Sequence, residues 1–187
     1  MYEMIRKSGD DKILCVPATV DIATELACLV NSAYRGESSL KGWTSEAKLI
    51  GGQRTDAEMI KKMIVAPASI VLVAKAASSV KSILGCVHVE SIKGGQCYLG
   101  MLTVETTLQN RGIGDHLMRA SELFARQEFS ATLMFMTVLE IRSELVAWYE
   151  RRGYKKTGEK KPFPYDDARF GRPLVPDLQF HILAKDL

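Results

Sequence analysis

The strongest constraint on the fold is a change of hydrophobic period in the middle of the chain. Two strand-like segments, residues 83–90 and 96–104, are joined by Lys93-Gly94-Gly95, which is a hairpin signal. A helical pattern over residues 111–127 follows, and then a buried strand over 132–139. Because hairpins give antiparallel neighbours and helical crossovers give parallel ones, this order predicts a mixed sheet with helices on its faces.

The flanking segments extend the same pattern. We expect Thr19 to cap a first helix, Thr55 to open a second through a Thr-x-x-Glu capping box, and Gly153 to end a fourth. Further strands are expected at residues 13–16, 70–74 and 178–182, with a short one near 155–157. The expected fold class is therefore α/β: a mixed, mainly antiparallel central sheet flanked by helices on both faces, in one domain spanning residues 1–187.

Composition narrows the classes of function. The formal net charge of +3 over 187 residues argues against nucleic acid as a partner. No apolar run approaches the roughly 20 residues that cross a bilayer, and residues 1–7 lack the apolar stretch of a signal peptide, so a cytoplasmic protein is expected. The four cysteines are far apart and not at zinc-ligand spacing from the histidines, which predicts buried reduced thiols and no metal site.

The segment most informative about function runs from Leu102 to Leu117. A strand ends at Val104, and a helix opens at Arg111–Gly112. The free N–H groups and positive dipole end of that helix suit a phosphate, and Gly112 and Gly114 have no Cβ to hold a pyrophosphate away. The candidate phosphate-binding residues of this turn are Gln109, Asn110, Arg111, Gly112, Ile113, Gly114 and Asp115.

Other phosphate-binding loops fit this turn poorly. A P-loop would need Gly-x-x-x-x-Gly-Lys-Ser/Thr, which the sequence lacks. A dinucleotide fingerprint would need a third glycine where Leu117 stands, and Glu140 lies too far beyond Gly112 to play the ribose-binding acid.

Two motifs carry a resemblance to a known family. Gln109-x-Arg111-Gly112-x-Gly114 resembles the acetyl-CoA pyrophosphate signature of the GNAT superfamily, and Ala147–Tyr154 resembles its Tyr-Glu-x-x-Gly-Phe/Tyr helix end. The resemblance implies a GNAT-like fold and transfer of an acetyl group from acetyl-CoA directly to a primary amine. One departure is Arg142, because many members carry Asn at this position, and helix packing or cofactor contact is in question there.

The resemblance also implies roles for single residues. Tyr149 matches the tyrosine that protonates the departing thiolate; the alternative is a core aromatic, because Tyr149 shares a helical face with Leu145 and Trp148. The resemblance further implies that the strand ending at Val104 bulges and splays from the next one. The freed main chain of Leu102, Thr103 and Val104 would then bind the pantetheine arm of the cofactor and offer amides to the anionic oxygen.

The general base is less constrained than the acid. Glu90 is slightly favoured over Glu105 and Glu37, and an ordered-water relay is an equal alternative.

The acceptor is left open as a small-molecule or peptide amine. Residues 163–167 with Trp43 are expected either to cover the acceptor or to pack on themselves, and His116 is expected to face solvent beside the phosphate. Cys86 and His88 are expected to pack rather than react. A homodimer is a further expectation, since dimers are common in the family. The rival function is a non-catalytic acyl-CoA-binding sensor of the same fold.

Overall fold

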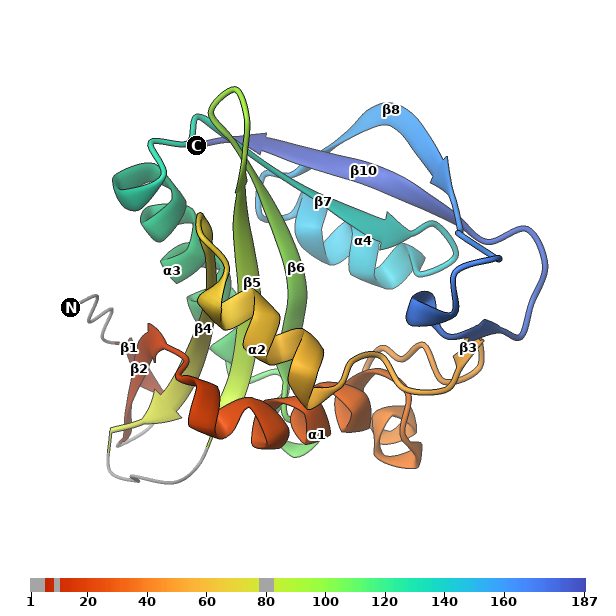
Figure 1. Ribbon diagram of the computed structural model, residues 1–187, viewed down its shortest axis with the longest axis horizontal. Coiled ribbons are helices and arrows are strands. Elements are labelled where there is room, and N and C mark those ends of the chain that lie inside the picture. The colour runs from red at the N-terminus through yellow and green to blue at the C-terminus, as the bar shows by residue number, and fades with distance from the viewer. Residues whose placement is uncertain (1–5, 9–10, 78–82) are drawn as a thin grey trace.

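The computed structural model describes residues 6–8, 11–77 and 83–187, so most of the 1–7 segment lies outside the described residues. The main sheet has the strand order β1-β2-β4-β5-β6-β7-β10-β8 (Figure 1). These strands are β1 (Arg6–Ser8), β2 (Asp11–Pro17), β4 (Ser69–Ala76), β5 (Ile83–Ile92), β6 (Gln96–Val104), β7 (Leu133–Leu139), β8 (Lys155–Pro162) and β10 (Gln179–Asp186). Every neighbouring pair is antiparallel except β6 and β7, which are parallel.

Within the described residues, four α-helices cover the two faces of this sheet. Helices α1 (Ala23–Tyr34) and α2 (Ala57–Val65) pack on one face, and α3 (Ile113–Glu128) and α4 (Ser143–Glu150) pack on the other. The alternation of β4 shows this directly, because Val71 and Val73 face the α1–α2 core while Leu72 faces the α3–α4 core. The expected α/β class with a mainly antiparallel sheet is confirmed.

Strand β6 carries an irregularity that opens the sheet. Its register against β5 shifts by one residue between Cys86 and His88, and Met101 at this point has a φ of 54°. One extra residue on β6 is the mark of a β-bulge, as the family resemblance implied. The parallel pairing of β6 with β7 is recorded only from Gln96 to Tyr98. Beyond Tyr98 the two strands separate, while β7 continues along β10.

Two segments far apart in the sequence meet beside this opening. The loop after α1 contains the short strand β3 (Ile50–Gly51), which pairs with β9 (Arg172–Pro173) of the C-terminal segment. Arg35 ties them further, since its guanidinium donates to the carbonyl oxygens of Gln53 and Phe170, both at 2.8 Å. Neither β3 nor β9 was expected from the sequence.

Several local expectations need correction. Asp56, not Thr55, caps α2, because its carboxylate accepts from the Met59 N–H at 2.7 Å. Thr19 precedes a 3₁₀ turn and makes no side-chain capping bond. Cys28 is exposed on α1, whereas the other three cysteines are buried as expected. No helix in the described ranges is long and apolar enough to cross a membrane.

Candidate active site

A cavity of about 410 Å³, the larger of the two described below, lies where β6 ends against α3 and α4. We call it the larger cavity throughout. Its wall combines the end of β6, the glycine turn 109–114, one face of α4 and the loop carrying Trp43 and Thr44. Of the ten predicted ligand-binding residues, all line this cavity except Arg111, whose side chain is exposed. The sequence motif and the cavity therefore coincide.

Backbone conformation explains the two glycines of the turn. Gly112 has a φ of 80° and forms the N-cap of α3, and Asn110 also has a positive φ of 63°. Such left-handed residues turn backbone N–H groups toward a common point, which suits an anion. A Cβ on Gly114 would lie 3.5 Å from Val104 and 3.6 Å from Trp148. These are ordinary van der Waals separations, so Gly114 lies against β6 and α4 at the wall of the larger cavity.

Two polar members of the turn are already engaged. The Gln109 side-chain oxygen accepts from the Trp43 N–H at 3.1 Å, which ties the glycine turn to the loop after α1. The Asp115 carboxylate lies 3.2 Å from both Arg119 and Arg152. Arg152 also stacks over the Trp148 ring at 3.5 Å and lines the larger cavity. Asp115 therefore orients Arg152, and its backbone amide rather than its carboxylate suits a phosphate.

Tyr149 lines the larger cavity and is only 6% exposed. Burial raises the pKa of its phenol well above the usual range, so the hydroxyl stays protonated at neutral pH. Its neighbour Tyr34 donates a hydrogen bond to the Leu102 carbonyl oxygen at 3.1 Å, and burial raises its pKa to about 12. Tyr149 is thus both part of the core and exposed to the cavity, so the two interpretations of this residue are compatible.

None of the three candidate bases lines a described cavity. Glu90 is exposed and lies opposite Tyr98 in the β5–β6 ladder. Glu37 is also exposed, and the Glu105 carboxylate accepts from Thr107 as a cap of the following 3₁₀ turn. Geometry gives no support to a carboxylate base at these positions.

A smaller cavity of about 90 Å³ adjoins the larger one between the separated strands β6 and β7. The two cavities share Tyr34, Leu102, Arg142, Leu145 and Tyr149. The C-terminal segment contributes an aromatic wall to the smaller cavity alone, made of Phe163, Phe170 and Phe180.

Arg142 belongs to a buried ionic network that the sequence did not reveal. It is the N-cap residue of α4, and its Nη1 lies 2.8 Å from Oε1 of Glu46. The other Glu46 oxygen lies 3.5 Å from Arg35 Nε, and Thr44 Oγ1 accepts from Arg142. This contact explains the departure from the family pattern, since Arg142 fastens the loop after α1 onto α4 while still facing both cavities.

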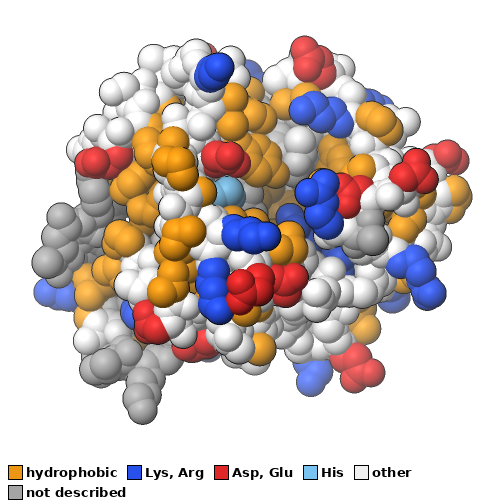
Figure 2. Space-filling model, viewed as in Figure 1, with side chains coloured by type: hydrophobic (Ala, Val, Ile, Leu, Met, Phe, Trp, Pro, Cys, Tyr) orange, Lys and Arg blue, Asp and Glu red, His pale blue; other side chains and the backbone are white. Residues whose placement is uncertain are grey.

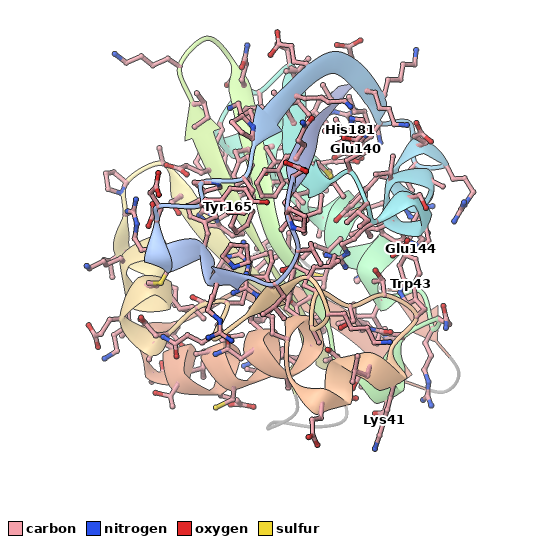
Figure 3. All side chains as sticks on the ribbon, turned by 90° about the vertical axis from the view of Figure 1, so that its right-hand side faces the viewer. Lys41, Trp43, Glu140, Glu144, Tyr165 and His181 are labelled. Atoms are coloured by element: carbon pink, nitrogen blue, oxygen red, sulfur yellow. The ribbon has the colours of Figure 1, made fainter. Side chains whose placement is uncertain are left out.

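The expected aromatic cover divides between the two cavities. Trp43 lines the larger cavity and Phe163 the smaller one. Figure 3 shows Tyr165 on the C-terminal segment, away from Trp43, which lies near Glu144 of α4. The Tyr165 hydroxyl accepts from the Leu178 N–H at 2.8 Å and so holds its own loop together.

The remaining reactive side chains lie in the core. His116 is 3% exposed, so the expectation that it faces solvent was wrong. Burial raises the pKa of Cys86 to about 12 and lowers that of His88 to about 4, which fits packing rather than nucleophilic chemistry.

Within the described ranges, no three His, Cys, Asp or Glu side chains are grouped to hold a metal ion. Basic and acidic side chains are interspersed on the face shown in Figure 2.

Solved structures share this fold over 70–94% of the chain. An IAA acetyltransferase from Bacillus cereus is 13% identical, with 94% of this chain and 99% of that chain covered and a TM-score of 0.64. A GNAT-family acetyltransferase from Staphylococcus aureus Mu50 is 12% identical, with 94% of this chain and 99% of that chain covered and a TM-score of 0.64. A GNAT-family acetyltransferase from Elizabethkingia anophelis with acetyl-CoA bound is 17% identical, with 70% and 82% covered and a TM-score of 0.56. At these identities the likeness establishes the fold.

A family model matches the middle of the sequence. Residues 67–156 match the family model described as an acetyltransferase (GNAT) domain, and this range contains both the glycine turn and the motif around Tyr149. This stretch of the chain is therefore similar to GNAT acetyltransferases, and the resemblance noted from the two motifs is confirmed. No curated protein matches the chain significantly.

Proposed function

We propose that this single-domain chain transfers the acetyl group of acetyl-CoA to the primary amine of a small molecule. One observation carries the proposal: the glycine turn and the phenol of Tyr149 line the same cavity. A pyrophosphate suits the amides of the turn, and an extended arm from it can follow the end of β6 toward Tyr149. The residues present thus fit acetyl-CoA, which supplies an activated acyl group when bound.

The chain's own residues would perform three tasks. The glycine turn anchors the phosphates, and the backbone beside the β6 bulge offers donors to the oxygen that becomes anionic. As the carbon–sulfur bond breaks and a carbon–nitrogen bond forms, Tyr149 donates its proton to the sulfur and is reprotonated as the amine releases its protons. With a thiol pKa near 8.5, the leaving group needs only a weak acid.

Thermal unfolding with acetyl-CoA, CoA or NAD tests the donor site. At 100 times the dissociation constant, acetyl-CoA adds roughly 2.7 kcal/mol to the free energy of unfolding. For a chain of this size we expect a rise in Tm of about 5–10 °C with acetyl-CoA and CoA, and none with NAD. No shift at millimolar acetyl-CoA would refute the proposal. Release of free CoA with an amine present then separates an enzyme from a sensor. The cytoplasmic location and the homodimer stay predictions.

A further inference from the structure

The smaller cavity carries an unusual balance of charge for its size. Three arginines line it, Arg35, Arg54 and Arg142, and Glu46 is the one carboxylate among its described lining residues. The side chains of Arg35, Arg142 and Glu46 are only 5%, 10% and 10% exposed. With every arginine charged, the cavity holds three positive charges against one negative charge. Buried charges of one sign are costly unless a partner of opposite sign is present.

The contacts show which of the positive charges lack a counterion. Glu46 is shared between Arg142, at 2.8 Å, and Arg35, at 3.5 Å. The Nε of Arg35 is buried without a hydrogen bond. The guanidinium of the half-buried Arg54 lies 5.6 Å from the centre of the Tyr34 ring, and no described carboxylate pairs with it. Arg54 is thus the arginine of the cavity that has no carboxylate partner among the described residues, while Arg35 and Arg142 share one.

Arg54 lies close to the place where chemistry is proposed. The guanidinium of Arg142 lies 5.9 Å from the centre of the same Tyr34 ring. Tyr34 and Arg142 also line the larger cavity, together with Tyr149. A single aromatic side chain therefore separates Arg54 from the junction of the two cavities. Only a short molecule can reach both points, with its anionic group at Arg54 and its amine near Tyr149.

We propose that the acceptor is a small amine that carries a carboxylate, as an amino acid does, and that Arg54 binds this carboxylate. The proposal rests on the proposed acetyl transfer and names its substrate class. A guanidinium matches a carboxylate in geometry and charge. The phenylalanine wall and Met136 give the rest of the acceptor an apolar surface, which favours amino acids with apolar side chains over polyamines or aminoglycosides.

The same excess of positive charge also favours deprotonation of the acceptor amine, for which none of the three candidate carboxylate bases lines either cavity. Because Arg35 and Arg142 share the single carboxylate of Glu46, one positive charge of this pair stays uncompensated after a carboxylate has paired with Arg54, and a like charge lowers the pKa of an ammonium. The amine therefore loses its proton to water more readily at the junction than in solution. A carboxylate at Arg54 anchors the molecule, and Arg142 keeps a positive charge near the amine end.

Matched pairs of acceptors test the proposal on the full chain with acetyl-CoA. The pairs are L-phenylalanine with 2-phenylethylamine, L-methionine with 3-(methylthio)propylamine, and L-leucine with isoamylamine; spermidine serves as a polycation. We expect at least one amino acid to be acetylated at least about tenfold faster, as kcat/KM, than its decarboxylated partner. Equal or faster acetylation of the decarboxylated amines, a preference for spermidine, or no acetylation of any amino acid would overturn the proposal.

Two variants assign the effect to one side chain. Arg54→Met should lower kcat/KM for the preferred amino acid about 10–100-fold, mainly through KM, and leave its decarboxylated partner within about threefold. Arg54→Lys should restore part of the loss. A loss of the same size for both partners would contradict carboxylate binding at Arg54. Acetyl-CoA binding is measured in parallel by calorimetry: its absence in the unaltered protein defeats the proposed function itself, whereas its presence without amino-acid preference defeats only this inference.

Discussion

The larger and smaller cavities share a border but are built in opposite ways. Most of the larger cavity comes from a short stretch of chain, the end of β6 and the glycine turn, and the binding groups proposed there are largely backbone amides. The smaller cavity is assembled from the end of α1, the loop after it, the middle of two strands, the start of α4 and the C-terminal segment, and its distinctive groups are arginine side chains. A backbone site is set by local conformation, whereas a side-chain site depends on tertiary assembly.

The largest expected effect is a loss of folding stability when the ion pairs of the smaller cavity are broken. Glu46→Ala leaves Arg35 and Arg142 buried without their shared carboxylate, and removing one partner of a buried ion pair costs about 3–5 kcal/mol. Urea unfolding should show this loss of stability. Glu58→Ala is the matched control, because Glu58 pairs with Lys61 at the surface, and it should change stability by no more than about 0.5 kcal/mol. Equal effects of the two variants would contradict the network.

At the border of the two cavities, Tyr149→Phe should lower turnover by on the order of 10²-fold or more and leave the dissociation constant of acetyl-CoA unchanged. The reason is that the variant removes the proton donor and keeps the ring. Tyr154→Phe is the control: its hydroxyl donates to Glu122 in the core, so stability should fall while turnover of the folded protein holds. Unchanged turnover in Tyr149→Phe would remove Tyr149 from the chemistry.

In the larger cavity, ligand binding should be weakened by a substitution that strains the backbone of the glycine turn. Gly112→Ala places a Cβ on a residue with a φ of 80° and should cost about 1–2 kcal/mol of stability. It should also weaken acetyl-CoA binding about tenfold, or about 1.4 kcal/mol. Gly94→Ala, in the β5–β6 hairpin at a φ of 85°, should show the same strain with normal binding. If both variants bind acetyl-CoA normally, the turn is not the phosphate site.

The smallest effect is expected outside both cavities. Glu90→Gln should change turnover by less than about threefold, because Glu90 is exposed and lines neither cavity. A pH–rate profile of the same variant checks the point independently. A drop of tenfold or more with a lost acid limb would restore Glu90 as the general base, the role that the sequence favoured.

The same contrast explains what could be predicted from the sequence. Strands β5 to β7 and helices α3 and α4 were predicted because their hydrophobic periods and glycine signals are local. The glycine turn and Tyr149 were found for the same reason. Glu46 and Arg54 gave no such signal, because they lie in a loop without a hydrophobic period. They become part of a cavity only when α4 and the C-terminal segment pack against this loop. His116 follows the burial of its helix face rather than its position in the motif.

The place of β10 has a consequence for how the chain folds. This last strand of the described chain lies between β7 and β8, so β8 has no described partner until β10 arrives, and one edge of β7 stays open. During synthesis, β8 therefore cannot pair until β10 is made, and β10 begins more than fifteen residues after β8 ends. Long-range pairings of this kind slow folding and leave strand edges exposed for association meanwhile. The lysine-rich sequence of β8 would discourage such association while the strand waits.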